Sequence, residues 1–436
     1  MSYAPPAQAN DVVALESRGE ALLKSGDLAG ADACFARIIE LEPRHLRALQ
    51  FLGIAATGRR DLVSAEALFR RALEVAPDNP RVHFNLALVL QTQRQFDAAL
   101  HHIEQCLAGA PRYLPGHLQR GLIYESLESK AAAVSSYLRA LRLADARGPA
   151  RLPAEVRRSL NHASAVVREQ LADEIAAALA PLSARHGEDR LRRVLDCADI
   201  FSGRRAADYA HPRWRPRFMY LPGLPVKPVW EREDLPWLAA VEARTEVVRR
   251  ELESVLGSEQ GFAPYVDNPP GSRAAEEWKA LNRSRDWSTF HFFRHGERIE
   301  ENCRRCPETA AMLESLDQMR VPGYAPEAMF SVLRPHTRIQ AHFGSVNGRL
   351  IVHLPLIVPP DCGALRVAGE ERGWTEGRCL VFDDSFEHEA WNDSDQTRIV
   401  LIFDTWNPDL SHAEREAFAT LMQVAKRFEL SHRAAD

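Results

Sequence analysis

Hydrophobic and polar positions follow two different periods along this chain. From residue 12 to about Leu195, apolar side chains recur at the three- to four-residue spacing of one helix face. From about Phe218 the sequence pattern changes: prolines cluster first, a helical stretch follows at Trp237–Leu256, and short apolar runs separated by turn residues come after it. The two patterns predict a helical N-terminal part and a strand-rich C-terminal part, with a domain boundary between them.

The helical part repeats itself. Pro43, Pro77 and Pro111 are spaced 34 residues apart, the period of tetratricopeptide repeats. Small and large apolar residues keep the same register, at Ala31, Ala65, Ala99 and Ala133, at Phe35, Phe69, Ile103 and Tyr137, and at Gly19, Gly53 and Gly121. Each unit is expected to be a helix pair that stacks on its neighbours, small residues allowing close approach and large ones filling the gaps.

The domain boundaries follow from these patterns. We expect a disordered N-terminus at 1–11, tetratricopeptide repeats at 12–147, a helical cap and linker at 148–215, and the second domain at 216–430. The stretch 204–217 is basic with interleaved aromatic residues, but the net charge of the chain is negative. It is interpreted as a solvated linker rather than a nucleic-acid site.

Five candidate strands lie in the second domain. They are Met329–Leu333, Arg349–Val358, Ala364–Val367, Arg378–Phe382 and Arg398–Thr405. Arg349, Ile351 and His353 share one face of the second of these, and Arg398 and Asp404 share a face of the last. Because unpaired basic side chains are costly to bury, these faces are expected to line a cavity that receives an anion. Many short strands favour a sandwich or barrel.

Composition narrows the class of protein. The chain has 436 residues, 45% hydrophobic and 26% charged, with a net charge of -5, which is typical of a globular protein and gives no reason to expect nucleic acid. Its apolar runs are shorter than the roughly 20 residues of a membrane span, and its N-terminus does not resemble a signal peptide. Seven scattered cysteines do not form a disulfide framework, so a cytoplasmic location is expected.

Candidate chemistry gathers around two histidines. His342 and His388 bracket the strand-rich stretch, and Arg398 follows ten residues after the second. Imidazole is a suitable ligand for Fe(II), and the planar guanidinium of arginine suits a dicarboxylate. Iron(II)/2-oxoglutarate oxygenases have two histidines and an arginine in this order. The spacing by itself leaves ordinary structural histidines open as the alternative.

Several segments resemble a known family. YLPGLPVKPVW, NGRLIVHLPLIVP, FDDSFEHEAWN and RIVLIFDTWNPDL are similar to blocks of the aspartyl/asparaginyl β-hydroxylase family over roughly residues 218–412. The resemblance implies a double-stranded β-helix of the jelly-roll or cupin-like kind with flanking helices. The predicted fold is therefore multidomain, with an all-α tetratricopeptide-repeat solenoid before this oxygenase domain.

By position, the resemblance implies a catalytic metal site at His342 and His388, both ligands of Fe(II). It implies that Arg398 and Ser331 hold the distal carboxylate of 2-oxoglutarate. The expected cofactors are Fe(II), 2-oxoglutarate and dioxygen, with ascorbate as an optional activator. The usual third ligand, a carboxylate two positions after the first histidine, is replaced by Gly344. The family itself lacks this carboxylate, and a water can fill the position.

The same resemblance assigns three further positions. His353 and Trp287 are expected to complete the 2-oxoglutarate pocket, and Arg349 is the expected substrate-binding residue. Better-known members carry a second arginine two residues after Arg349, where this chain has Ile351. This departure weakens the expectation of an aspartyl substrate and leaves an asparaginyl or other polar group open.

Other residues were weighed as rivals for the metal site. Cys303 and Cys306 have the spacing of half a zinc knuckle, but a second suitable pair does not follow, so a non-metal interpretation is preferred. His336 is set aside for its turn context. Asp383 and Asp384 are expected to shape the turn before His388 rather than to bind iron.

The predicted function is hydroxylation of an aspartyl or asparaginyl side chain in a peptide or protein that the repeats present to the iron. The partner is thus a peptide or protein substrate, with no nucleic acid and no membrane span. The alternatives are a small-molecule or lipid hydroxylase and a non-catalytic repeat scaffold. Halogenation is a runner-up reaction, because a missing carboxylate also admits chloride.

Overall fold

The structure is a computed structural model that describes residues 6–148, 151–257 and 260–431. The chain divides into two compact units, the second of which covers residues 171–433. The first five residues of the N-terminus expected to be disordered lie outside the described residues. Helix α1 begins at Pro6, earlier than expected, because proline is tolerated in the first turn of a helix.

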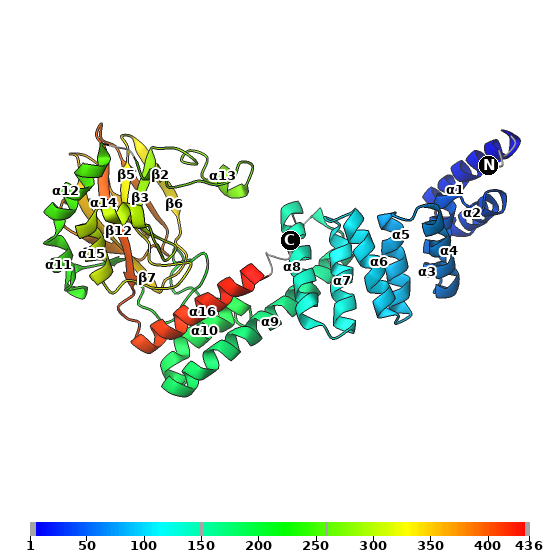
Figure 1. Ribbon diagram of the computed structural model, residues 1–436, viewed down its shortest axis with the longest axis horizontal. Helices are drawn as coiled ribbons and strands as arrows, with labels where there is room; N and C mark the ends of the chain where they lie inside the picture. The colour runs from blue at the N-terminus through cyan, green and yellow to red at the C-terminus, as the bar shows by residue number, and fades with distance from the viewer. Residues whose placement is uncertain (1–5, 149–150, 258–259, 432–436) are drawn as a thin grey trace. The chain divides into compact units, whose positions relative to one another are not determined.

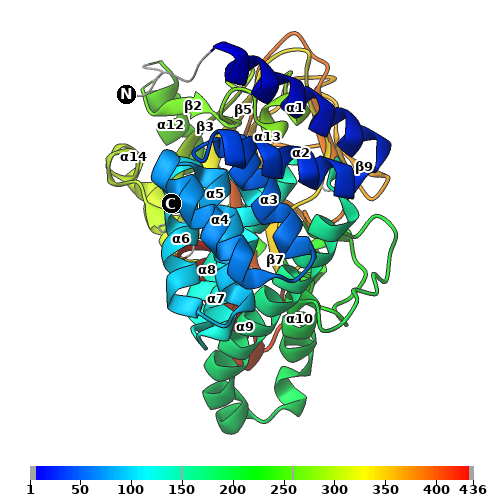
Figure 2. The same ribbon diagram turned by 90° about the vertical axis from the view of Figure 1, so that its right-hand side faces the viewer.

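Antiparallel helix pairs build the first unit, as the repeat period predicts (Figures 1 and 2). The helices are α1 Pro6–Ser25, α2 Leu28–Leu41, α3 Leu46–Gly58, α4 Leu62–Val75, α5 Pro80–Thr92, α6 Phe96–Gly109, α7 Leu114–Ser126 and α8 Lys130–Arg147. Polar residues start several of them, because a side-chain oxygen accepts a bond from a free N–H of the first turn. Asp27 caps α2, Asp61 caps α4, and Asn79 caps α5.

The repeat glycines allow the close helix approach predicted from the sequence. A Cβ added at Gly53 would lie 2.6 Å from the ring of Phe69, and one at Gly121 would lie 2.2 Å from the ring of Tyr137. Both aromatic rings are at most 1% exposed. A larger residue at either glycine would therefore push the aromatic side chain of the second helix out of the core.

Helix α9 (Ala154–His186) crosses the division between the units, and α10 (Arg192–Ser202) follows it. The segment expected to cap the repeats contributes from Leu171 onward to the core of the second unit. Leu179 and Val194 lie in one hydrophobic cluster with Phe418. This packing, which the helical pattern by itself did not reveal, makes α10 part of the second unit.

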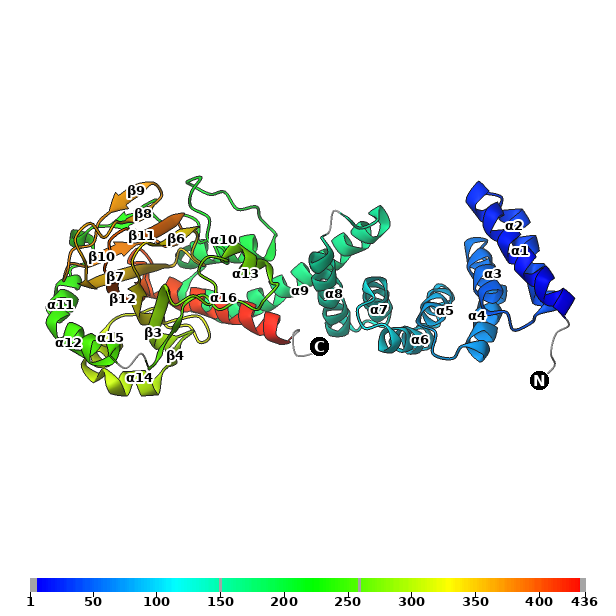
Figure 3. The ribbon, with the colours of Figure 1, turned by 90° about the horizontal axis from the view of Figure 1, so that it is seen from above.

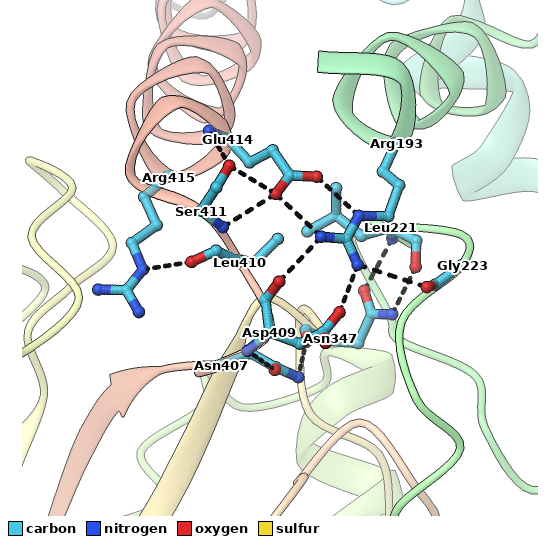
Figure 4. Close-up of polar contacts among 10 residues, drawn as sticks. All are labelled: Arg193, Leu221, Gly223, Asn347, Asn407, Asp409, Leu410, Ser411, Glu414 and Arg415. Carbon is cyan, nitrogen blue, oxygen red and sulfur yellow. Dashed lines mark hydrogen bonds and ion pairs between the residues drawn. The ribbon is translucent and has the colours of Figure 1, made fainter. Parts of the chain in front are cut away.

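A polar network fastens α10 to helix α16 (His412–Ser431), as Figure 4 shows. The Arg193 guanidinium donates to both carboxylate oxygens of Glu414, at 2.7 and 2.9 Å, and to the backbone carbonyl of Asp409 at 2.9 Å. Ser411, just before α16, donates its N–H and O–H to the same carboxylate, and its hydroxyl oxygen accepts from the Glu414 N–H. Because Glu414 is 5% exposed, this bidentate pair is shielded from water and holds the two helices together.

The second unit contains two antiparallel sheets. The larger has the order β1-β10-β7-β12-β5-β3-β2, with β4 paired to β3. Its strands are β1 Val229–Trp230, β2 Phe262–Pro264, β3 Trp287–Arg294, β4 Glu297–Arg298, β5 Ala328–Leu333, β7 Arg349–Ile357, β10 Leu380–Phe382 and β12 Arg398–Trp406. The smaller, β6-β11-β8-β9, is formed by β6 Thr337–His342, β8 Leu365–Val367, β9 Glu370–Arg372 and β11 His388–Asn392. This arrangement is that of a jelly roll.

Helices cover the outer face of the larger sheet, and the smaller sheet lies against its other face (Figure 3). The covering helices are α11 Leu238–Glu242, α12 Thr245–Leu256, α14 Glu300–Arg305 and α15 Pro307–Ser315; a short helix, α13 Arg273–Glu277, precedes β3. Leu350, Val352 and Leu354 pack outward under the helices, whereas Ile351 faces the smaller sheet. The two faces predicted for this strand are therefore confirmed.

All five predicted strands are present, as β5, β7, β8, β10 and β12, with ends that differ by up to two residues. The helical stretch predicted at Trp237–Leu256 is α11 followed by α12. None of the described helices combines the length and the apolar composition that crossing a membrane requires.

Candidate functional site

Two strands of the smaller sheet bring His342 and His388 together. His342 ends β6, His388 begins β11, and the two residues are cross-strand partners whose ring centroids lie 4.1 Å apart. Each Nδ1 lies within hydrogen-bond distance of a backbone carbonyl two residues earlier, 2.8 Å for Gln340 and 2.9 Å for Phe386. An Nδ1–H donated to a carbonyl leaves Nε2 with a free lone pair, which is the form that binds a metal.

Burial keeps this pair neutral. It lowers the pKa of His342 to about 3, with a further contribution from His388, and it also lowers the pKa of His388. Neutral imidazole is the metal-binding state. Within the described part of the chain no group of three or more His, Cys, Asp or Glu side chains is arranged to hold a metal ion. The candidate metal centre is therefore a pair of imidazoles.

The space that a carboxylate side chain at position 344 would need for a third metal ligand is occupied by Asp384. A Cβ added at Gly344 would lie 2.2 to 2.5 Å from the carboxylate atoms of Asp384. That carboxylate accepts a hydrogen bond from Arg349 at 2.9 Å, and its charge counteracts the effect of burial on the pKa of His388. Asp384 thus lies beside the histidines but is turned toward Arg349.

A buried cation lies at the other end of the site. Arg398, at the start of β12, is 1% exposed, and its Nε and Nη1 atoms have no hydrogen-bond partner among the described residues. Burial lowers the pKa of Arg398 to about 10, so the group is still charged at pH 7. A buried, unpaired guanidinium is costly unless an anion joins it.

Two hydrogen-bonded pairs of side chains lie in the same region as this arginine. Trp287 donates its indole N–H to the Ser331 hydroxyl oxygen at 3.1 Å, which leaves the Ser331 O–H free to donate. The Trp374 indole N–H lies 3.2 Å from His353 Nδ1. Ser331, His353 and Arg398 all line the cavity that also contains His342 and His388, a space of about 120 Å³. The structure therefore brings all the predicted metal- and cofactor-binding residues together.

Arg349, the predicted substrate-binding cation, is already paired. Besides Asp384 it lies 3.6 Å from Asp404, and both carboxylates are buried. Burial raises the pKa of Asp404 to about 7, although Arg349 acts against it. The two neighbouring carboxylates offset the charge of this guanidinium, although its Nε has no hydrogen-bond partner among the described residues.

Apolar residues occupy the wall between the two ends of the cavity. Met329 on β5, Ile402 on β12 and His353 on β7 are aligned across three adjacent strands, and Ile351 is paired with Asp404 in the next row. Met329, Ile351 and Ile402 line the cavity. We call these three residues the apolar belt.

The site includes two tryptophans that the sequence analysis did not single out. Trp374 contacts both His353 and Arg398, and the ring of Trp278 lies edge-on to His342 with centroids 5.1 Å apart. Neither lies in a predicted strand. For Trp374, the surrounding segment GWTEG indicates only a turn. The sequence does not reveal that its partners are His353 and Arg398.

Apart from Asp384, the rival residues do not line the cavity. His336 is on the surface, 2.9 Å from Asp395. Asp383 shapes the turn before His388, because its carboxylate accepts from the Ser385 N–H at 2.9 Å and from the Trp214 indole at 3.1 Å. Cys303 and Cys306 are buried in the cluster on the outer face of the larger sheet.

Fold and cavity together define the class of protein. It is a jelly-roll domain with paired imidazoles in its cavity, preceded in the sequence by an array of helix pairs. Residues 242–408 match the family model described as Aspartyl/Asparaginyl beta-hydroxylase. Residues 17–80, 68–101 and 114–147 match tetratricopeptide-repeat models. The chain thus carries a domain of the aspartyl/asparaginyl β-hydroxylase family preceded by tetratricopeptide repeats, as predicted.

Three relatives illustrate the range of this family. An ornithine lipid ester-linked acyl 2-hydroxylase of Rhizobium tropici is 37% identical over 200 residues, covering 45% of this chain and 66% of that protein. The mouse aspartyl/asparaginyl beta-hydroxylase is 30% identical, covering 48% and 27%. Mouse aspartate beta-hydroxylase domain-containing protein 2 is 35% identical, covering 47% and 57%. The chain spans less than two thirds of each relative, and these likenesses support a hydroxylating enzyme.

Proposed function

We propose that the C-terminal domain is an Fe(II)- and 2-oxoglutarate-dependent hydroxylase. The observation that carries the proposal is the buried Arg398, whose Nε and Nη1 have no partner in the part of the chain that the structure describes, in one cavity with two neutral imidazoles. A carboxylate would remove the cost of the unpaired cation. Imidazole nitrogens suit Fe(II), and 2-oxoglutarate offers one carboxylate to the metal and another to an arginine.

Each side chain then has a defined part. His342 and His388 would hold the metal through Nε2, while Arg398 and the Ser331 hydroxyl would bind the distal carboxylate of 2-oxoglutarate. His353 and Trp287 complete that pocket, and Trp278 packs edge-on against the ring of His342. When bound, iron with 2-oxoglutarate and dioxygen supplies the oxidising chemistry, and succinate and carbon dioxide are released. The residues of this chain bind, orient and exclude water.

The test is an anaerobic titration of the full chain with Fe(II) and 2-oxoglutarate, in which the metal-to-ligand charge-transfer band is recorded. We expect the band in the wild type and its loss in His388→Ala, because one imidazole does not retain the metal. His336→Ala is the matched control, since His336 is an exposed histidine outside the cavity, and should keep the band. A folded wild-type protein without the band would contradict the proposal and favour the scaffold alternative.

For the substrate, we propose a peptide or protein that the tetratricopeptide repeats present to the iron, with an asparaginyl or aspartyl side chain as the hydroxylated group. Tetratricopeptide arrays commonly bind protein segments along their concave face. The name of the mouse relative, aspartyl/asparaginyl beta-hydroxylase, agrees with such a substrate.

A specific observation favours a second candidate, hydroxylation of an acyl chain. The apolar belt of Met329, Ile351 and Ile402 lines the cavity, and Arg349 is engaged by two carboxylates. An apolar wall beside an arginine that two carboxylates already engage suits a hydrocarbon better than an acidic side chain. The Rhizobium tropici relative is named as a lipid acyl hydroxylase.

Ile351→Arg separates the two candidates. A charge in the apolar belt should lower succinate release that depends on an acyl-chain amphiphile at least about tenfold, since an unpaired charge beside a hydrocarbon costs more than 1.4 kcal/mol. The same change should maintain or raise release that depends on an aspartyl peptide. Ile351→Leu is the volume-matched control and should change neither rate by more than about threefold. A loss with the peptide and not with the amphiphile would remove the acyl candidate.

A further inference from the structure

One buried side chain, Trp374, contacts two of the residues assigned to the 2-oxoglutarate pocket, His353 and Arg398. Trp374 lies on the connection between β9 and β10, is 7% exposed, and belongs to the core cluster that the two sheets share. Its ring is at 22° to the ring of His353 and lies beneath the guanidinium of Arg398. His353 and Arg398 come from different strands, so Trp374 is the element that both contact.

The contact with His353 determines which nitrogen of that ring carries the proton. The indole N–H can only donate, and it lies 3.2 Å from His353 Nδ1, so Nδ1 must be the acceptor. Burial and the nearby Arg398 lower the pKa of His353, so the ring is neutral and has one N–H. That N–H is then on Nε2, where it can donate to a carboxylate in the cavity. The other tautomer would present a lone pair and repel the same carboxylate.

The contact with Arg398 orients a charge. The guanidinium carbon lies 4.5 Å above the centre of the Trp374 ring, a cation–π distance. The indole ring restricts the position of the guanidinium on one side, while Nε and Nη1, which lack partners among the described residues, stay open to a ligand. The same indole therefore presents two donors to one space, a neutral N–H from His353 and the fork of Arg398.

We propose that Trp374 is a positioning residue that orients His353 and Arg398 for a dicarboxylate. The ligand named here, 2-oxoglutarate, rests on the function proposed above. Trp374 does not line the cavity itself, so it acts through the two residues it contacts. If Trp374 were merely structural, substituting it would affect folding but would not change the His353 tautomer. Its effect on ligand binding would then be the same whether or not His353 is present.

The first experiment reads the tautomer directly. In full-length protein labelled with ¹⁵N-histidine, with His353 assigned by His353→Leu, the metal-free wild type should show a protonated Nε2 and an unprotonated Nδ1. Trp374→Phe retains the aromatic face but lacks the N–H, and should give shifts averaged between the two tautomers. Trp237→Phe, a tryptophan change on the outer side of the sheet, should leave the His353 signals unchanged. A wild-type His353 with a protonated Nδ1 would overturn the proposal.

The second experiment measures binding. In the anaerobic charge-transfer titration, Trp374→Phe should raise the Kd of 2-oxoglutarate about five- to tenfold, the range of one hydrogen bond. In a His353→Leu background the same substitution should change Kd by less than about twofold, because the coupled partner is gone. Equal effects in both backgrounds would overturn the positioning role. If wild type binds no 2-oxoglutarate, the proposed function fails, and the tautomer measurement still decides the role of Trp374.

Discussion

Arg398→Met should abolish 2-oxoglutarate binding without destabilising the metal-free protein. The guanidinium offers charge-assisted hydrogen bonds to a carboxylate, each worth about 1.5 to 3 kcal/mol, so losing two of them should raise Kd at least about 100-fold. In the absence of ligand, the same group is a buried charge whose Nε and Nη1 find no partner among residues 6–148, 151–257 and 260–431. Replacing such a charge by an apolar side chain of similar length is neutral or stabilising.

Two measurements on the same variant check this expectation. The anaerobic titration gives Kd, and thermal unfolding of the metal-free protein should give a midpoint equal to or above that of the wild type. Added Fe(II) and 2-oxoglutarate should raise the midpoint of the wild type only, since a ligand stabilises the state that binds it. Arg366→Met is the control, because Arg366 forms exposed ion pairs with Glu371 and Glu389. Unchanged binding in Arg398→Met would remove this arginine from the site.

The repeats could be read from the sequence because each unit uses the same contacts. Glycines and aromatic residues 16 apart, such as Gly53 and Phe69, meet within one helix pair, and the match recurs at Gly121 and Tyr137. The 16-residue spacing within one repeat therefore predicts a tertiary contact between its two helices. The end of the array was harder to predict, because α9 has helical spacing throughout and only its packing separates residues before and after Leu171.

In the second unit, alternation revealed some strands and concealed others. The strand from Arg349 alternates and was found, whereas β3, Trp287–Arg294, is buried on both faces along most of its length, and its sequence WSTFHFFR shows no regular alternation of apolar and polar residues. Strand β6, Thr337–His342, is largely exposed and polar, so it reads as a loop. Both of these strands contribute to the site, since β3 begins with Trp287 and β6 ends with His342, and so does β11, also not predicted, which begins with His388.

Residue chemistry and family resemblance pointed to the histidines and Arg398, but they could not give the state of each group. Arg349 was expected to be a free cation for substrate, and its pairing with Asp384 and Asp404 depends on segments that meet only in the fold. The contact of Trp374 with His353 likewise joins a connection to a strand two elements away in the chain. Such pairings follow from sheet topology, which single-strand periodicity does not encode.

Gly344→Asp, which introduces the carboxylate found in the usual metal triad, should lower the free energy of unfolding by about 3 kcal/mol or more rather than improve the metal site. The new Cβ would lie 2.2 to 2.5 Å from three atoms of the Asp384 carboxylate. The Asp384 side chain is short and is paired with Arg349. Its own backbone carbonyl accepts from the Gly344 N–H at 2.6 Å, so the two residues are also held together through the backbone. Relief requires breaking a buried ion pair, which typically costs 3 to 5 kcal/mol.

The clash predicts a specific rescue. In an Asp384→Gly background, Gly344→Asp should cost less than about 1 kcal/mol in denaturant unfolding, because the space is then empty. Anaerobic dialysis should also show tighter Fe(II) binding in the double variant than in Asp384→Gly, since a third donor lies beside the two imidazoles. An equal cost of Gly344→Asp in both backgrounds would mean that Asp384 is not the obstacle. Rescue would instead identify the carboxylate of Asp384 as the reason this fold has glycine at the triad position.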